Sequence, residues 1–326
     1  MKRALNGSAI VYSLSLVVLI IGQPLLSGWV PLLELVYVAL PFLFAPVIFL
    51  LGWALVAKSP LVWACCVSLL LLFCWRWGGL FISFNGGEQA TDLKVVSFNL
   101  GPGVSSLSEK ERYINQLEAD FLVLVEFTPD IEPLLTKKLS QSYPFSARSD
   151  KNPTILLLSR FEIVSIQEIW LEDSNNGRPS LHAEVTTPSG MVHLLLIHPA
   201  PPDVLRVGRL PSGIDHRQHK KDFAQLTTYI NFLNGPVILA GDFNLSAETE
   251  IYSDLTQTLI DSHVSAGRGF GFSFPVYDLY GRPMWFPLVR IDYILHSHHF
   301  LTVNSQTDCD TPSNHCLIQA DLAYRP

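Results

Sequence analysis

The sequence is poor in charged residues, and the deficit is concentrated at its N-terminal end. Lys, Arg, Asp and Glu make up 16% of the 326 residues, against about a quarter in soluble domains. No charged side chain lies between Arg3 and Glu34, between Glu34 and Lys58, or between Lys58 and Arg76. Each gap can hold a membrane-crossing helix, which needs about 17–25 apolar residues, and this argues against a wholly soluble protein. We predict three such helices, over about Ser8–Trp29, Leu32–Ala57 and Pro60–Trp77.

A cleaved signal peptide is the alternative for the first segment, because Lys2 and Arg3 precede an apolar run. No A-x-A cleavage site follows Ile21, however, and two more apolar segments come after it, which favours three spans. Two spans are the other alternative, because the third segment is the shortest of the three. Lys58 lies between the second and third segments, whereas no Lys or Arg separates the first two. The positive-inside rule therefore predicts a cytoplasmic N-terminus and a C-terminal domain on the other side of the membrane.

Cysteine is scarce and gives no sign of a disulfide framework. Cys65, Cys66 and Cys74 lie in the apolar region, where a small, soft side chain packs easily. Cys309 and Cys316 could pair in an oxidising compartment, but two cysteines so near each other more often occupy a loop and a strand as free thiols.

An excess of basic residues is also missing. The first 90 residues hold four of the 22 basic and two of the 29 acidic residues, so the remainder carries a formal charge of −9. Nucleic-acid-binding domains normally carry a basic patch, so this balance argues against a broad electrostatic grip on nucleic acid.

Short apolar runs of strand length recur after a polar segment at 85–92, which we interpret as a linker between a membrane anchor (1–84) and a second domain (93–326). The runs are Leu93–Leu100, Phe121–Phe127, Thr154–Leu158, Ile163–Leu171, Val192–His198, Val237–Ala240, Ile291–Leu295 and Leu317–Leu322. Helices are predicted from a capping box at Ser108–Glu111, from Thr128-Pro129, and over His216–Leu233. Many strands with few helices predict an α/β fold of two packed sheets flanked by helices, rather than a doubly wound sheet.

Polar residues gather at the ends of these strands. They are Asn99, Glu126, His198, Asp242, Asn244, Asp292 and His315. Each by itself has a structural explanation as a turn or capping residue. Because strand ends converge in a layered α/β fold, the whole set indicates one cleft.

In this order, the set resembles the endonuclease/exonuclease/phosphatase superfamily over Leu93–Leu322. The most specific motifs are Gly241-Asp242-Phe243-Asn244, Arg290-Ile291-Asp292-Tyr293 and Ser313-Asn314-His315. Further details resemble a bacterial branch with an N-terminal membrane anchor: His198–Pro202, Arg217-Gln218 and Ser273-Phe274-Pro275. The resemblance implies a DNase I-like two-sheet sandwich that N-terminal helices anchor to a bacterial cell membrane.

The resemblance also implies roles for the catalytic residues. His315 would be the general base for the attacking water, and Asp292 would orient its ring. Asp242 and Asn244 would orient that water and stabilise the transition state, while His198 would donate to a phosphate oxygen or the leaving group.

Metal binding is implied at Glu126 and Asn99, which would hold Mg²⁺ or Mn²⁺ through oxygen atoms. Where the family usually has Ser-Asp-His, this chain has Asn314 in the middle position. An amide oxygen still coordinates Mg²⁺, so Asn314 is a third candidate ligand, with weaker binding expected.

The leading hypothesis is a metal-dependent phosphatase or phosphodiesterase at a membrane surface, with lipid-linked phosphates favoured, since anchoring raises the effective concentration of substrates on that surface. A nuclease is the runner-up, and a catalytically inactive membrane-bound binding protein is the third reading. The bilayer is the expected partner, and no protein partner is inferred.

The remaining histidines are interpreted as structural. We expect His296, His298 and His299 in a solvated loop, because no Cys, Asp or Glu stands nearby at ligand spacing. His216 and His219 belong to a charged helix start and are expected to face solvent.

Overall fold

The computed structural model describes residues 2–26, 30–82, 90–101, 105–127, 132–152, 154–171, 178–278 and 280–325. The chain divides into two compact units. The first comprises residues 1–82 together with 203–215 and 248–250, and the second comprises the rest. Most of the predicted linker at 85–92 lies outside the described residues.

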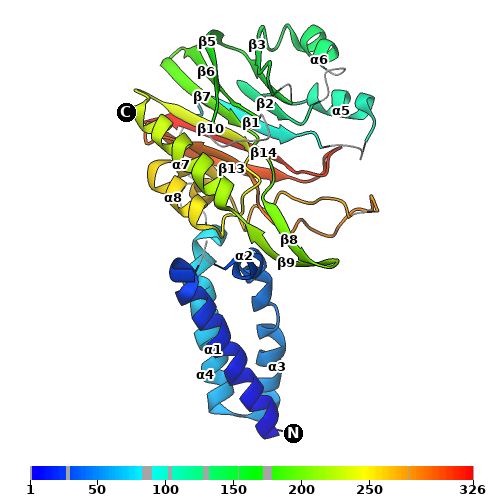
Figure 1. Ribbon diagram of the computed structural model, residues 1–326, viewed down its shortest axis with the longest axis vertical. Helices are drawn as coiled ribbons and strands as arrows, with labels where there is room; N and C mark the ends of the chain where they lie inside the picture. The colour runs from blue at the N-terminus through cyan, green and yellow to red at the C-terminus, as the bar shows by residue number, and fades with distance from the viewer. Residues whose placement is uncertain are drawn as a thin grey trace. The chain divides into compact units, whose positions relative to one another are not determined.

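Apolar helices build most of the first unit (Figure 1, blue). They are α1 (Lys2–Leu26), α2 (Pro31–Val38), the 3-10 helix η1 (Leu40–Phe44), α3 (Val47–Ala57), α4 (Pro60–Trp77) and the 3-10 helix η2 (Gly78–Phe81). Within the described residues, three stretches are long and apolar enough to cross a membrane: Lys2–Leu26, Leu40–Ala57 and Pro60–Phe81. The second is shorter than the predicted Leu32–Ala57, because Pro41 and Pro46 interrupt the α-helix between Val38 and Val47.

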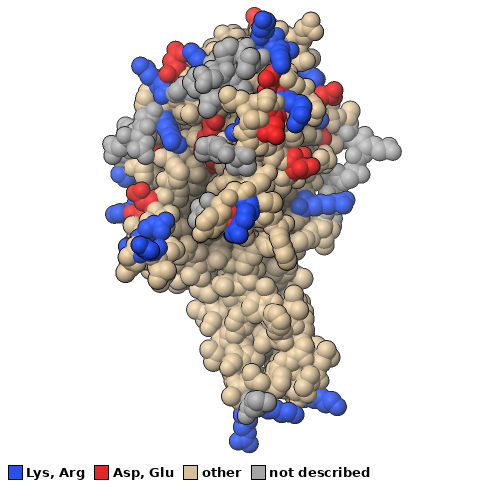
Figure 2. All heavy atoms as spheres, turned by 90° about the vertical axis from the view of Figure 1, so that its right-hand side faces the viewer, with Lys and Arg blue, Asp and Glu red and all other residues tan. Residues whose placement is uncertain are grey.

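Three basic residues of the first unit, Lys2, Arg3 and Lys58, lie at one end of its helices. Asn6 Nδ2, near the start of α1, donates a hydrogen bond to Ser59 Oγ at the start of α4 (3.4 Å). This contact brings Lys2 and Arg3 to the same end as Lys58. In Figure 2, Lys and Arg lie at one end of the helices, whose surface is otherwise almost uncharged.

A hairpin and an ion pair complete the first unit. Strands β8 (Asp203–Val207) and β9 (Leu210–Asp215) form a two-stranded sheet, and β9 packs against α2. Near the C-terminal end of α4, Arg76 Nη2 lies 2.7 Å from Glu248 Oε2. The sequence reasoning missed this hairpin, because its strands are short and exposed.

The second unit is a sandwich of two six-stranded sheets (Figure 1). The first sheet has the order β13-β14-β1-β2-β4-β3, and the second has the order β11-β12-β10-β7-β6-β5. The strands of the first are β1 (Leu93–Asn99), β2 (Phe121–Val125), β3 (Phe145–Arg148), β4 (Ile155–Ser159), β13 (Phe300–Asp308) and β14 (Leu317–Tyr324). Those of the second are β5 (Glu162–Ile169), β6 (Ser180–Thr187), β7 (Gly190–Ile197), β10 (Val237–Asp242), β11 (Ile260–Asp261) and β12 (Asp292–His296). The predicted two-sheet α/β architecture is confirmed.

Helices cover the outer faces of both sheets. Helices α5 (Leu107–Ile114) and α6 (Glu132–Leu139) pack on the first sheet, through Ile114, Leu135 and Leu139. Helices α7 (Arg217–Phe232) and α8 (Glu250–Thr258) pack on the second, and α9 (Ser262–Ala266) contacts β12 and β13. Burying each large aliphatic side chain stabilises the fold by about 1.5–3 kcal/mol.

Two of the three predicted helix starts can be compared with the structure. The capping box of α5 is formed by Ser106 and Glu109, with Glu109 N donating to Ser106 Oγ (3.3 Å), so the prediction of Ser108–Glu111 was wrong by two residues. The sequence offers serine at both positions, and only the pairing distinguishes them. Helix α7 agrees with the prediction of 216–233, whereas Thr128-Pro129 lies outside the described residues.

Strict alternation decides which side chains enter the space between the sheets. In β1, Leu93 and Val95 belong to the core between the sheets, whereas Val96 and Phe98 pack under the helices. The same alternation holds in β6, β7, β10 and β12. Strands such as β6 and β13 were missed because their outward positions are polar, so they contain no continuous apolar run.

Strand pairing brings polar strand ends to one edge of the sandwich. Strand β1 runs parallel to β2, and β7 runs parallel to β10, so their carboxyl ends lie together in each sheet. Asp242 is the register partner of Asp292 on the antiparallel strand β12. Gly241 has a φ of +143°, and a Cβ there would lie 2.1 Å from Ile197 O, so β7 and β10 pair this closely only with glycine.

Several predictions about cysteine and histidine were wrong. Cys309 and Cys316 form a disulfide. His296 is fully buried on β12 and its Nε2 lies 2.7 Å from Thr302 Oγ1, because the strand continues through the stretch taken as a loop. His219 is 4% exposed, and burial lowers its pKa to about 4.

Candidate active site

Four of the predicted site residues continue the inward-facing rows of the sandwich. Asn99 extends the row of Leu93 and Val95, and the other three extend the corresponding rows of the second sheet. The four residues are Asn99 (1% exposed), His198 (2%), Asp242 (1%) and Asp292 (2%). Their polar side chains therefore stand where the apolar core ends, between the two sheets.

Glu126 reaches the same place through a break in the alternation. It follows Val125, which faces inward, and would face outward if the strand continued. Its φ of +54° ends the strand. Its Oε1 lies 3.2 Å from His198 Nε2, which joins the first sheet to the second. The side chain of Glu126 is 30% exposed, so one part of the site is open to solvent.

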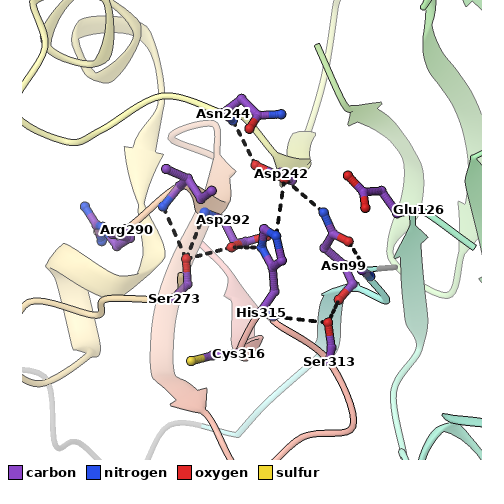
Figure 3. Close-up of polar contacts among 12 residues, drawn as sticks. Asn99, Glu126, Asp242, Asn244, Ser273, Arg290, Asp292, Ser313, His315 and Cys316 are labelled. Carbon is purple, nitrogen blue, oxygen red and sulfur yellow. Dashed lines mark hydrogen bonds and ion pairs between the residues drawn. The ribbon is translucent and has the colours of Figure 1, made fainter. Parts of the chain in front are cut away.

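His315 lies between two carboxylates (Figure 3). Its Nδ1 donates a hydrogen bond to Asp292 Oδ2 (3.0 Å), and its Nε2 lies 4.0 Å from Asp242 Oδ2. The Asp292 contact fixes the ring with one proton on Nδ1. Nε2 is therefore the ring nitrogen left to face Asp242 and the space between the two sheets.

Asp242 connects the two halves of the site. Its Oδ2 accepts a hydrogen bond from Asn99 Nδ2 (2.9 Å), and its Oδ1 accepts one from Asn244 N (2.8 Å). Asn244 has a φ of +50° and donates through Nδ2 to Pro199 O (3.0 Å), directly after His198. These contacts hold the Asp-Phe-Asn segment across the ends of β10 and β7.

Residues outside the predicted set position the His315–Asp292 pair. Ser273 Oγ donates to Asp292 Oδ2 (2.6 Å) and accepts from Asp292 N (3.2 Å). The ring of Phe274 lies against His315, with centroids 4.6 Å apart. Ser313 Oγ donates to Asn99 O (2.6 Å) and accepts from His315 N (3.1 Å). Ser273 and Phe274 were noted only as part of a resemblance, and spacing alone could not connect them to a residue some forty positions later.

The charges of the site act on one another strongly. Burial lowers the pKa of His315, but the carboxylates of Asp292, Asp242 and Glu126 outweigh burial and raise it to about 9. Burial, reinforced by Asp292, raises the pKa of Asp242 to about 6. The hydrogen bond from His198 lowers the pKa of Glu126. The three carboxylates of the site thus leave it with an excess of negative charge.

The donor set fits a hard divalent cation. Ligand atoms of Glu126, His198 and Asp242 lie within 4.8 Å of one another, as do those of Asp242, Asp292 and His315. Carboxylate and amide oxygens are the preferred ligands of Mg²⁺, and a cation would offset the burial and the Asp292 charge that together raise the pKa of Asp242. Glu126 and Asn99 would hold the ion, with Asp242 beside them.

Lys110 is a charged residue near this site that sequence reasoning missed. It is 7% exposed on α5, and its ammonium group donates to Gly101 O (2.5 Å), two residues after Asn99. Burial lowers its pKa, while the Glu126 carboxylate opposes that shift. In the sequence it stands among charged residues of a helix start, a pattern typical of a solvated face.

Asn314 faces a neighbouring loop through its side-chain oxygen. Oδ1 accepts a hydrogen bond from Tyr277 N (2.8 Å), and the backbone oxygen accepts one from Val276 N (2.9 Å). The predicted metal ligand therefore already has a protein partner. An aspartate in its place would keep one oxygen on Tyr277 and gain a second, charged oxygen.

We predict that Asn314→Asp lowers the Mg²⁺ concentration needed for half-maximal hydrolysis, because an added anionic ligand strengthens a hard-cation site. The measurement is a Mg²⁺ titration of phosphoester hydrolysis, with Gln306→Glu at an exposed position of β13 as the control for added charge. A half-maximal concentration equal to that of the wild type would show that position 314 does not act on the metal.

Comparisons with known proteins agree with this geometry. The chain matches the profile of the Endonuclease/Exonuclease/phosphatase family over residues 111–315. A search of curated proteins gives no match. Among solved structures, an endonuclease/exonuclease/phosphatase family protein from Bacteroides thetaiotaomicron is similar, with a TM-score of 0.58 and 17% identity over 73% of this chain and 97% of that one.

Two further similar structures carry names of enzymes. Mannosyl-6-phosphatase from Bacteroides thetaiotaomicron has a TM-score of 0.55 and 17% identity, covering 71% of this chain and 100% of that one. Sphingomyelinase C from Streptomyces griseocarneus has a TM-score of 0.53 and 17% identity, covering 71% and 99%. At such identities the likeness shows the shared fold, whereas the profile match spans more than half of the sequence. The chain belongs to the endonuclease/exonuclease/phosphatase family, whose members are mostly hydrolases of phosphoester bonds.

Proposed function

We propose that the protein is a membrane-anchored, divalent-metal-dependent phosphatase or phosphodiesterase that acts on lipid-linked phosphates. The observation that carries the chemistry is the buried line Asp292–His315–Asp242, with distances of 3.0 Å and 4.0 Å, facing Asn99 and Glu126. The anchor is supported by the three apolar stretches of the first unit.

Each residue of the site is assigned one part of the proposed hydrolysis. A divalent cation bound by Glu126 and Asn99 would supply positive charge to the phosphate oxygens. The 4.0 Å separation between His315 Nε2 and Asp242 Oδ2 exceeds a direct hydrogen bond and suits a water held by both groups. A cation bound beside these carboxylates would offset the charge that raises the pKa of His315 and leave Nε2 unprotonated. Nε2 would then accept the proton of that water as it attacks phosphorus, while Asp292 stabilises the imidazolium that forms.

His198 and Asn244 complete the proposed site. His198 Nε2 is buried beside Glu126 and is placed to donate to a phosphate oxygen or to the leaving group. Asn244, held over Pro199, stabilises the negative charge that develops during the attack. No covalent intermediate is required.

An exposed apolar loop supports a substrate with a lipid portion. The loop begins beside Asn314, whose backbone and side-chain oxygens accept hydrogen bonds from Val276 N and Tyr277 N. Beyond them, large side chains face solvent: Tyr280 (84% exposed), Trp285 (99%) and Leu288 (40%). Large apolar side chains exposed on one loop beside a site are suited to bind an apolar partner. Aromatic side chains also stack on bases, but the acidic balance after residue 90 disfavours a nuclease.

A substrate panel tests the proposal. Full-length protein in detergent micelles is assayed with lipid phosphates, soluble inositol phosphates and DNA, with Mg²⁺, with Mn²⁺ and with a chelator. We expect metal-dependent hydrolysis that is fastest for lipid phosphates. Preferred cleavage of DNA would establish the nuclease instead, and absence of hydrolysis in every arm would favour a binding protein.

We predict further that the N-terminus is cytoplasmic and the catalytic domain lies on the opposite side of the membrane. Lys2, Arg3 and Lys58 share one end of the helices, while Arg76 at the other end is paired with Glu248. The Cys309–Cys316 disulfide also suits a compartment outside the reducing cytoplasm.

Reporter fusions measure this topology. Alkaline phosphatase, which is active only after export, and a fluorescent protein that folds only in the cytosol are each joined after Gln89. Phosphatase activity without fluorescence is expected. The reverse pattern would place the active site in the cytoplasm and remove the support that the topology gives to an external lipid substrate.

A further inference from the structure

A second group of metal-ligating side chains lies on the outer face of the second sheet. His182 and Glu184 occupy alternate positions of β6, and His193 on β7 is the register partner of Glu184. The inward neighbours Leu181, Ala183 and Val185 belong to the core, so these three polar side chains point the other way, under α7. Their ligand atoms lie within 4.8 Å of one another.

The two imidazoles face each other at a distance close to that in a metal site. His182 Nε2 and His193 Nδ1 are 3.0 Å apart. Two nitrogens bound to one tetrahedral zinc ion at about 2.05 Å are separated by about 3.3 Å, so a shift of a few tenths of an ångström would admit the ion. Glu184 Oε1 lies 3.6 Å from His193 Nδ1, on the same side.

Each of the three side chains is oriented by a further partner. His193 Nε2 donates to Asn234 O (3.1 Å), which leaves a lone pair on Nδ1. Tyr229 OH lies 2.8 Å from His182 Nδ1 and 3.3 Å from Gln167 Oε1. Ser165 Oγ donates to Glu184 Oε2 (2.8 Å), which leaves Oε1 toward the histidines. Metal-binding histidines and carboxylates are held by such outer contacts.

An ion can bind between His182 and His193 while both imidazoles stay neutral, because the hydrogen-bond network allows the proton between them to move. The proton now shared between His182 Nε2 and His193 Nδ1 would move to His182 Nδ1 and be donated to Tyr229 OH. The hydroxyl would then donate its own proton to Gln167 Oε1. Both ring nitrogens that face each other would carry lone pairs, as metal ligation requires.

We propose that His182, His193 and Glu184 bind a transition-metal ion of the zinc type, at a site separate from the catalytic centre. Two imidazole nitrogens and one carboxylate oxygen match the ligands that zinc prefers, whereas Mg²⁺ prefers oxygen ligands alone. The Glu184 side chain is 34% exposed and provides the entrance, and a water would complete the coordination.

The site is remote from the phosphoester chemistry. His193 precedes His198 by five residues along β7, or about 16 Å at 3.3 Å per residue, and the two side chains lie on opposite faces of the sheet. An ion there would join β6 and β7 and, through Tyr229, hold α7 against them. Its expected effect is on the stability of the domain.

A cobalt titration tests the site in the full-length protein, prepared without a histidine tag, stripped of metal, and kept in excess Mg²⁺ to occupy the oxygen-rich centre. Co²⁺ reports a tetrahedral nitrogen and oxygen site through its visible absorption. We expect one equivalent of Co²⁺, displaced by Zn²⁺, and a Zn²⁺-dependent rise in melting temperature. His193→Ala should abolish all three signals, and the exposed His298→Ala should retain them.

Two milder variants keep the result interpretable if His193→Ala unfolds. Glu184→Gln should weaken Co²⁺ binding while preserving the shape of the side chain. Tyr229→Phe should weaken it about tenfold, the lower end of the usual loss of an outer partner. Wild-type protein that takes up no Co²⁺ in Mg²⁺, or equal titrations for wild type, His193→Ala and Glu184→Gln, would overturn the proposal.

Discussion

Replacing His315 with alanine is expected to lower the turnover number for phosphoester hydrolysis at least about a hundredfold, and Asp242→Ala is expected to do the same. The first change removes the proposed general base, which typically contributes a factor of 10²–10⁴. The second removes the carboxylate that faces Nε2 at 4.0 Å and that binds Asn99 and Asn244. Loss of a group that stabilises the transition state typically lowers turnover by a factor of about 10²–10³.

Neither substitution should unfold the domain. Without His315, Asp292 keeps the hydrogen bonds of Ser273. Turnover of a nitrophenyl phosphodiester and of the best lipid phosphate, together with circular dichroism, measures both effects. His298→Ala, an exposed histidine on the same domain, is the matched control. Hydrolysis near the wild-type rate by either folded variant would show that the catalytic assignment is wrong.

Arg290→Met is expected to destabilise the catalytic domain by about 3–5 kcal/mol, because it leaves a buried carboxylate without its cation. Arg290 is 5% exposed, and its Nη2 and Nη1 lie 2.9 Å and 3.3 Å from the oxygens of Asp261. Burial would raise the pKa of Asp261, but the guanidinium and the Tyr252 hydroxyl hold it below its usual value. The Arg290 guanidinium also lies over the ring of Tyr293, 4.8 Å from its centroid.

The control is a similar ion pair at the surface. Arg282 Nη2 lies 2.6 Å from Asp278 Oδ2, and the arginine side chain is 71% exposed, so Arg282→Met should cost at most about 1 kcal/mol. Urea unfolding followed by near-ultraviolet circular dichroism compares the two. A loss below about 1 kcal/mol for Arg290→Met, or a loss of activity at unchanged stability, would contradict a structural role for this arginine.

The sequence predicted the parts of the fold that are buried on both faces. Strands such as β2 and β10 are continuous apolar runs, and each ends at a polar residue of the site, Glu126 and Asp242. Strand β6 carries His182 and Glu184 on its outer face, so its pattern looked like a polar segment. Pairing partners distant in sequence, such as Ser273 with Asp292, depend on the folded chain and have no local signal.

The lack of a local signal for contacts between distant residues also explains why the role of Arg290 and the disulfide were not predicted. Arg290 belongs to the Arg290-Ile291-Asp292-Tyr293 motif, but its guanidinium points to Asp261, and Asp292 is the residue of this motif that faces His315 (Figure 3). The disulfide was disfavoured because spacing in the sequence does not report where a strand begins. Cys316 directly precedes β14, and the loop from Cys309 folds back to it.

The close approach at Gly241 sets a limit on how this site can be altered. Any side chain there would meet Ile197 O at 2.1 Å and push β10 from β7. Asp242 and His198 follow immediately on those two strands, so the separation would open between a carboxylate and an imidazole of the proposed site. The missing side chain of Gly241 thus sets the distance between the two strands that carry Asp242 and His198. Engineering of substrate preference has freedom in the exposed loop at 280–288 and none at the glycine before Asp242.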